Sequence, residues 1–208
     1  LWFDVQMLAV ATHLGWGDFG SPLVDRQDTK FEWARQIAVS VAATFGTRRI
    51  NVQIRPNGSL PAEQARTKAF SYCEFATDAL FHAGALVDTL HTLTQDEEGN
   101  SEVEPLWSFN DSAIQRALSW QLPYVVRNET WPFEQIVPFF PPNCSENMVD
   151  QCASTYFWPI RKAALVPQYV TSSTWDYETA LDQVPGLDAS NTYLDMFLPA
   201  ANCISPSQ

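Results

Sequence analysis

The sequence predicts an all-α protein, and two observations on its 208 residues support this prediction. Apolar residues recur at intervals of three and four along several long segments, which is the spacing of one face of an α-helix. Strict alternation of apolar and polar residues, the pattern of a half-buried strand, is almost absent. Because 46% of the residues are hydrophobic, the chain can bury a core. Helices joined by long loops are typical of a bundle or an (α/α) toroid.

Two helices are predicted in the first quarter of the chain. Residues 2–14 carry apolar side chains at helical spacing. A second helix is capped by Asp28 or Thr29 and stops at Gly46. Residues 50–61 are predicted to be extended or looped, because a Pro-Asn-Gly turn signal lies within them.

The longest predicted helix runs from about residue 63 to residue 92, with a buried stripe of apolar side chains. An acidic, solvated loop follows at 95–104. Asp111 or Ser112 then opens another helix, which we expect to close before Pro123.

The remaining sequence is rich in proline and poor in charge. Residues 130–145 are interpreted as a loop with aromatic anchors, residues 145–166 as a helix, and residues 167–208 as an irregular tail. We interpret residues 1–208 as part of a single domain.

The charge balance argues against a general nucleic-acid-binding protein. Twelve basic residues against twenty-four acidic ones give a net charge of -12, whereas binding by counterion release needs a basic surface. No run of 18 apolar residues occurs, so no membrane-spanning helix is predicted. Five basic residues nevertheless fall within a short stretch, which indicates either a local anion site or a solvated basic edge. They are Arg48, Arg49, Arg55, Arg66 and Lys68.

Two patterns predict a secreted, extracellular glycoprotein. The four cysteines form no CxxC pair, which disfavours a zinc site and favours disulfides. Cys144 and Cys152 are the most plausible local bridge, and Cys73 is expected to be a buried free thiol. The chain also has four Asn-X-Ser/Thr sequons, of which the last three are the better candidates for glycans. The sequons begin at Asn57, Asn110, Asn128 and Asn143.

Residues 53–72 read QIRPNGSLPAEQARTKAFSY. This segment resembles the signature of the alginate lyase superfamily of polysaccharide lyases, roughly Gln-Ile-x-x-Asp-Gly-Ser-x-Pro-x-Glu-Leu-Ala-Arg-Thr-Lys-Ser-x-His-Tyr. Residues 1–11 are similar to the family's Trp-Tyr-Asp-Val-Gln helix, residues 106–109 to its Leu-Trp turn, and residues 117–136 to a later helix and loop. The resemblance, closest to fungal-type alginate and glucuronan lyases, covers most of residues 1–136.

The sequence departs from the family pattern at several positions. Asn57 replaces an aspartate, Gln64 a leucine and Ser71 a histidine. The family also places an Asn-Asn-His-Gly motif directly before the helix that here begins at Leu1-Trp2. We therefore expect a second polypeptide or an upstream segment to carry that motif, unless the protein lacks a complete lyase site.

The resemblance implies an (α/α) toroid, incomplete in this chain, whose cleft binds an anionic uronate polysaccharide and cleaves it by β-elimination without a metal or other cofactor. Arg66 and Tyr72 fall on the family's catalytic positions. Arg66 would neutralise the substrate carboxylate with its planar fork, and Tyr72 would act as acid and also as base. We expect Arg66 at a helix start, turned toward Tyr72. The residues expected to bind substrate are Trp2, Gln6, Lys68 and Trp107.

Three functions remain open at this point. The first is a uronan lyase, and the second is a non-catalytic carbohydrate-binding or partner subunit that keeps the cleft. The third is an inverting glycoside hydrolase, which ranks last because it needs paired carboxylates and Glu63 is the only acid of the motif. The histidines at 13, 82 and 91 have no second metal ligand at a suitable spacing and are interpreted as structural.

Overall fold

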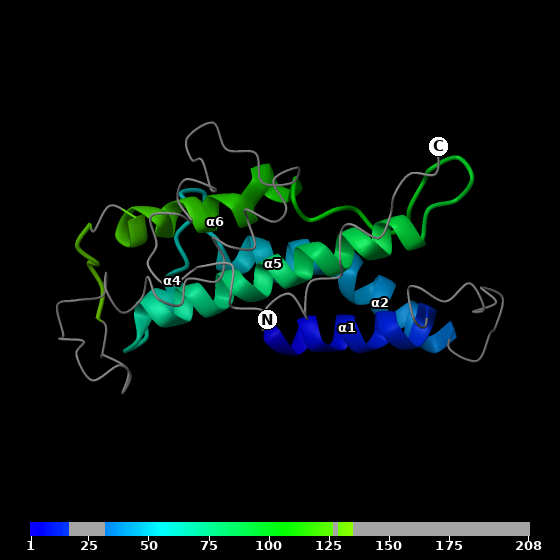
Figure 1. The fold of residues 1–208 in the computed structure, drawn as a ribbon, viewed down its shortest axis with the longest axis horizontal. Coiled ribbons are helices and arrows are strands. Elements are labelled where there is room, and N and C mark those ends of the chain that lie inside the picture. The colour runs from blue at the N-terminus through cyan, green and yellow to red at the C-terminus, as the bar shows by residue number, and fades with distance from the viewer. Residues whose placement is uncertain (17–31, 127–128, 135–208) are drawn as a thin grey trace, which may run out of the picture.

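A computed structural model describes residues 1–16, 32–126 and 129–134 of the protein (Figure 1). Within these ranges the regular elements are helices and none is a strand, so the all-α class is confirmed. The helix α5 (Ala69–Leu93) is the longest of the described helices and runs between α1 and α6 (Figure 1). Closure of the helices into a toroid remains a prediction. None of the described helices is long and apolar enough to cross a membrane.

The first two helices pack closely on each other. They are α1 (Trp2–Trp16), which confirms the helix predicted over 2–14, and α2 (Glu32–Phe45). The face of α2 that is buried carries alanines at intervals of four, which let the two backbones approach. At the end of α1, the Arg35 Nε donates a hydrogen bond of 2.7 Å to the carbonyl oxygen of Gly15.

The α-helix α2 ends directly before Gly46, as predicted, but residues 50–53, which were predicted to be extended or looped, are helical. The chain continues through a π-helix, η2 (Gly46–Ile50), and a short helix, α3 (Asn51–Gln53). A Cβ atom at Gly46 would lie 2.6 Å from the ring of Phe109. The glycine is therefore needed for close packing against that ring, and the chain continues past it as a π-helix. The turn that follows is as predicted, with Gly58 at a φ of 87°.

The single long helix predicted over 63–92 is two helices in the structure. The short α4 (Pro61–Gln64) ends before a break at residues 65–68, and α5 begins at Ala69. The backbone N–H of Ala69 donates to the carbonyl oxygen of Glu134 at 3.1 Å. In a continuous helix this N–H would bond to the carbonyl oxygen four residues earlier. Because it bonds to Glu134 instead, the helix is interrupted here.

Helix α6 (Phe109–Val126) agrees with the prediction at the start of its regular part and differs from it at its end. Asn110–Ser112 have left-handed backbone angles, so the regular helix begins only after them. Pro123 lies inside α6, whereas we expected the helix to close before it. The last turn is held by packing, since the ring of Tyr124 lies 4.9 Å from that of Trp131.

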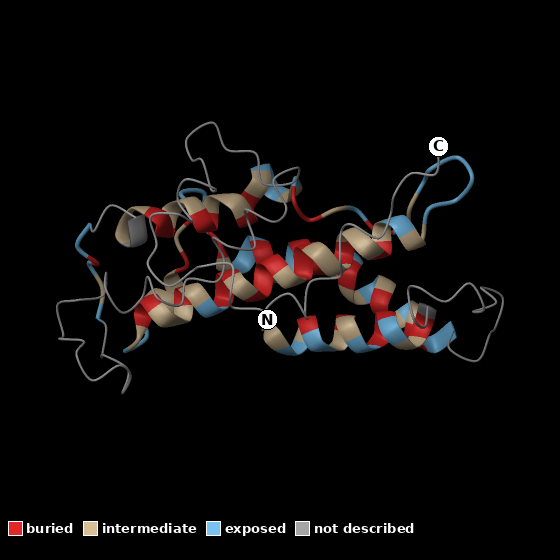
Figure 2. Ribbon diagram, in the orientation of Figure 1, coloured by how far each residue is buried: buried red, intermediate tan, exposed pale blue. Residues whose placement is uncertain are grey.

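Buried residues concentrate on the face of α5 that packs against the other helices (Figure 2). The predicted stripe of α5 is confirmed. Its members Phe70, Cys73, Ala76, Leu80, Gly84 and Val87 are all buried. The aromatic anchors predicted after residue 130 are confirmed within 129–134, where Trp131 packs edge-on against Phe70 at 4.9 Å and is 8% exposed. Through this contact the loop closes over the beginning of α5.

Several predictions concern residues outside the described ranges. These are the helix over 145–166, the tail over 167–208, the bridge between Cys144 and Cys152, and the sequons at Asn128 and Asn143. They stay predictions.

Candidate functional site

Arg66 and Tyr72 lie together at the start of α5. The Arg66 Cζ is 3.3 Å from the centroid of the Tyr72 ring, so the guanidinium stacks on the ring face. The Arg66 Nη1 also donates to Glu63 Oε2 at 3.1 Å. The side chain of Arg66 is 48% exposed, which leaves the stacked pair open to solvent. The sequence pattern did not assign any contact to Glu63.

The break before α5 explains this geometry. On one continuous helix, positions 66 and 72 would point about 120° apart. Arg66 instead lies between α4 and α5, where the backbone is irregular and the side chain can turn back onto the first turn of α5. This is the orientation expected from the sequence.

Lys68 is the residue that precedes α5, and it is half-buried. Its carbonyl oxygen accepts a hydrogen bond of 3.0 Å from the N–H of Tyr72, which forms the first helical turn. Lys68 itself has a non-helical backbone, with a φ of -119° and a ψ of 54°, and it lies at the same end of α5 as Arg66.

Trp2 lies against α5 one turn beyond Tyr72. Its indole Nε1 donates to the carbonyl oxygen of Phe75 at 3.1 Å, and its ring lies 5.0 Å from the Phe75 ring. Gln6, one turn further along α1, is exposed. Phe75 is a residue that the sequence did not single out, although a large apolar side chain off the buried stripe of α5 is a signal that could have drawn attention to it.

Trp107 lies in the core and is 6% exposed. Its ring packs against Phe81 at 5.6 Å between centroids, and a Cβ at Gly84 would lie 2.7 Å from it. The expectation that Trp107 stacks on a sugar does not agree with this position. The reason is that Gly84 provides space on α5 for the ring, which the spacing of the motif alone does not reveal.

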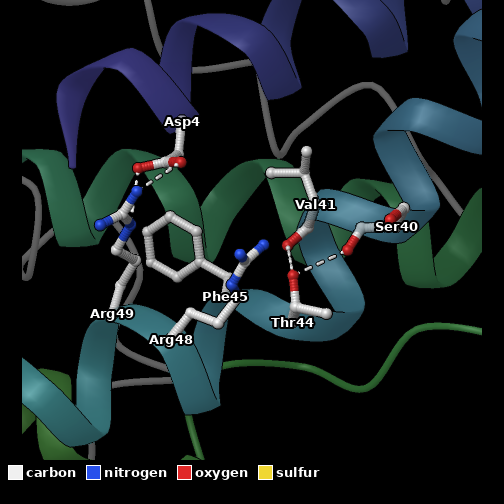
Figure 3. A pocket seen from close by; sticks show the side chains of 7 residues that line it. All are labelled: Asp4, Ser40, Val41, Thr44, Phe45, Arg48 and Arg49. Carbon is white, nitrogen blue, oxygen red and sulfur yellow. Dashed lines mark hydrogen bonds and ion pairs between the residues drawn. The ribbon is translucent and has the colours of Figure 1, made fainter.

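Four of the five basic residues of 48–68 are divided between two places, and the fifth, Arg55, is exposed. Arg66 and Lys68 lie at the start of α5, whereas Arg48 and Arg49 line a pocket of about 70 Å³ between α1 and α2–η2 (Figure 3). In this pocket the Arg49 Nε and Nη2 contact the two carboxylate oxygens of Asp4 at 2.8 and 3.0 Å. The predicted cluster is therefore not one continuous anion site.

The Asp4 carboxylate neutralises much of the positive charge in this pocket. Burial raises the pKa of Asp4, but hydrogen bonds from Arg49 and the amino group of Leu1 lower it more, and the net pKa lies below its ordinary value. The Thr44 hydroxyl donates to the carbonyl oxygen of Ser40 at 2.9 Å (Figure 3). The geometry thus indicates a structural ion pair that holds α1 to η2.

Cys73 is a free, buried cysteine, as predicted. Burial, with a smaller contribution from the carboxylate of Glu63, raises the pKa of its thiol to about 12. The thiolate is the nucleophilic form of cysteine, so Cys73 is not suited to covalent catalysis.

Two histidines of α5 have partners within the protein. The His91 Nδ1 lies 2.6 Å from the carbonyl oxygen of Val103, and the His82 Nε2 lies 3.9 Å from Asp78 Oδ2. His13 is exposed on α1. In the part of the chain that the structure describes, no three His, Cys, Asp or Glu side chains are grouped so that they could hold a metal ion.

Two of the four sequons fall in described segments. Asn57 is exposed, and its Oδ1 accepts hydrogen bonds from the N–H and the hydroxyl of Ser59 at 3.1 and 2.8 Å. Asn110 is exposed at the start of α6. Both side chains are at the surface, where a glycan needs to be.

Comparison with known proteins adds one finding. A family model described as alginate lyase matches residues 21–131, which include α2 to α6 and both Arg66 and Tyr72. No curated protein and no solved structure matches the chain significantly. The matched segment is more than half of the sequence and contains the motif on which the resemblance was based. The chain belongs to the alginate lyase family.

Proposed function

We propose that this protein is a polysaccharide lyase that cleaves a uronic-acid polymer, alginate or glucuronan, by β-elimination. Membership of the alginate lyase family supports lyase activity on a polysaccharide. The single observation that carries the proposal for this chain is the stacking of the Arg66 guanidinium on the Tyr72 ring at 3.3 Å. It combines a carboxylate-binding cation and a group able to transfer a proton in one solvent-exposed place.

The first requirement of the reaction is neutralisation of the substrate carboxylate. Removing the C5 proton next to a carboxylate creates an enolate-like charge, which is prohibitively high in energy unless a cation or hydrogen-bond donors stabilise it. The guanidinium of Arg66 has five N–H donors in a planar fork. Glu63 contacts one of its nitrogens, Nη1, so the other edge of the fork remains suited to a bidentate contact with a uronate.

The second requirement is proton transfer. In the proposed step the Tyr72 oxygen, starting as phenolate, removes the C5 proton. The electron pair of that bond forms the C4–C5 double bond, the C4–O4 bond breaks, and the Tyr72 hydroxyl returns its proton to the leaving O4. Arg66 and Lys68, at the start of α5, supply the positive charge that favours these proton-transfer steps.

A non-catalytic carbohydrate-binding subunit is the alternative. It is favoured by the position of the histidines, because His82 lies ten residues beyond Tyr72 on α5, a rise of about 15 Å. No histidine within the described ranges is therefore placed on the same turn as Tyr72 to share the proton transfer. In this alternative the cations and aromatic rings would bind the polymer without cleaving it.

A spectroscopic assay separates the two functions. β-Elimination leaves an unsaturated uronate that absorbs in the ultraviolet, whereas binding leaves the polymer unchanged. We expect absorbance to rise when the protein is incubated with alginate or glucuronan. Arg66→Lys should abolish most of this activity, because an ammonium cannot reproduce the bidentate fork. Arg55→Lys, an exposed arginine of the same basic stretch, is the matched control and should be as active as the unmodified protein.

A further inference from the structure

We propose that Phe75 and Trp2 form a sugar-binding subsite, the Phe75–Trp2 platform, beside Arg66 and Tyr72. It would take the pyranose ring of the polymer that neighbours the uronate held by Arg66. The identity of the polymer rests on the function proposed above. The existence of the platform as a binding surface rests on the geometry described below.

Phe75 is unusually exposed for its residue type and position. Twelve of the 25 residues of α5 are buried. Phe75, near the start of this helix, is 56% exposed. One exposed apolar side chain is ordinary on a protein surface. Phe75 differs because its ring contacts a second aromatic ring, that of Trp2 on another helix, so the two rings form one exposed aromatic cluster.

The two rings are held in place by the backbone. The Trp2 Nε1 donates to the carbonyl oxygen of Phe75 itself at 3.1 Å, and the two ring planes are inclined by 34° with centroids 5.0 Å apart. The Trp2 ring also lies 5.4 Å from that of His82. Because the indole is fixed before any ligand arrives, a sugar that stacks here loses less free energy to the ordering of side chains.

The platform is adjacent to the proposed catalytic pair. Phe75 follows Tyr72 by three residues, one turn of α5 with a rise of about 4.5 Å, and lies on the same side of the helix. Consecutive rings of a polysaccharide can therefore contact Tyr72 and Phe75 in turn. Lys68 directly precedes the first residue of α5 and so lies at the same end of the helix as Arg66.

The charges around the platform agree with this assignment. Two nearby carboxylates have positively charged or titratable partners: Glu63 contacts Arg66 Nη1 at 3.1 Å, and Asp78 lies 3.9 Å from His82 Nε2. The positive groups, Arg66 and Lys68, lie at the start of α5. An anionic sugar therefore meets cations at its carboxylate edge, and its C–H face meets the aromatic rings.

Binding of tetrasaccharides of glucuronate and of mannuronate by calorimetry tests the platform. The measurements use Tyr72→Phe, so that the ligand is not consumed, with and without Phe75→Leu, which keeps an apolar helix-forming residue but removes the ring. We expect Phe75→Leu to raise the Kd about tenfold, the loss of roughly one aromatic contact. Phe3→Leu is the matched control, since Phe3 is 70% exposed on α1 and has no ring contact among the described residues. It should leave the Kd unchanged.

Kinetics separate this proposal from the proposed function. With Tyr72 intact, Phe75→Leu should raise KM for the polymer about tenfold and leave kcat within about twofold, because uniform binding is lost. A protein that forms no unsaturated product, but whose tetrasaccharide binding depends on Phe75, would refute the lyase function and support the platform. A protein that forms product, with the same Kd and KM after Phe75→Leu, would overturn the platform alone. Thermal unfolding of each variant shows whether the fold is intact.

Discussion

Gly58 belongs to the family motif and packs against α6, and its substitution by alanine should destabilise the protein strongly. Gly58 is buried in the turn before α4, and its N–H donates to the carbonyl oxygen of Arg55 at 2.8 Å. Its φ is 87°, a conformation that residues with a Cβ rarely adopt. A Cβ at this position would also collide with the backbone carbonyl of α6, since it would lie 2.7 Å from the carbonyl carbon of Arg116.

These two effects have different magnitudes and can be separated. Holding alanine in a left-handed conformation costs about 1–2 kcal/mol. Forcing a methyl group against a packed backbone costs about 1–3 kcal/mol more. We therefore expect Gly58→Ala to lower the free energy of unfolding by about 2–5 kcal/mol.

Gly99 provides the matched control. It has nearly the same φ, 84°, but a Cβ there would meet no atom within 4 Å. Gly99→Ala should therefore cost only the conformational part, about 1–2 kcal/mol. Urea unfolding followed by circular dichroism measures both values. Equal losses in the two variants would refute the argument that the turn at Gly58 is packed against α6, and with it the account of how this turn is held before Arg66.

Two further predictions concern charges and the buried thiol. Because the pKa of Asp4 is lowered in the folded protein, its ion pair with Arg49 stabilises the fold above the unfolded pKa, and this stabilisation is lost as the pH falls through the folded pKa. The free energy of unfolding should drop by less than about 1 kcal/mol below pH 4, since the Arg49 side chain is 40% exposed. Asp4→Asn should remove this pH dependence. An unchanged slope in Asp4→Asn would assign the acid sensitivity to other groups. Cys73, with its pKa raised to about 12, should resist alkylation at pH 8 until the protein is unfolded, and native labelling that decreases in Cys73→Ala would contradict its burial.

The sequence predicted those parts of the fold that depend on local pattern. The helix at 2–14 and the buried stripe of α5 follow from the spacing of apolar residues. The break at residues 65–68 does not, because it depends on the hydrogen bond between Ala69 and Glu134, which are far apart in the chain. Similarly, the end of α2 before Gly46 was predicted, but the packing of Phe109 beside this glycine depends on a residue far along the chain.

The candidate site shows the same division. The motif predicted that Arg66 turns toward Tyr72, and the two side chains are stacked. The motif also suggested Trp107 as a sugar-binding residue. Whether a tryptophan faces a cleft or the core depends on its neighbours. Here the absence of a side chain at Gly84 leaves space for the Trp107 ring in the core. Phe75 was missed for the opposite reason, because only the structure reveals that an apolar residue of α5 is exposed beside Trp2.

The effect of Tyr72→Phe on the formation of unsaturated uronate tests the central claim most directly. The substitution removes one hydroxyl from a half-buried ring, so the stacking with Arg66 and the fold should survive. We predict that the unmodified protein generates ultraviolet absorbance from alginate or glucuronan and that Tyr72→Phe reduces the rate by about 10²-fold or more, the scale of a lost general acid or base. Full activity in Tyr72→Phe, or no absorbance from either polymer with the unmodified protein, would contradict the account.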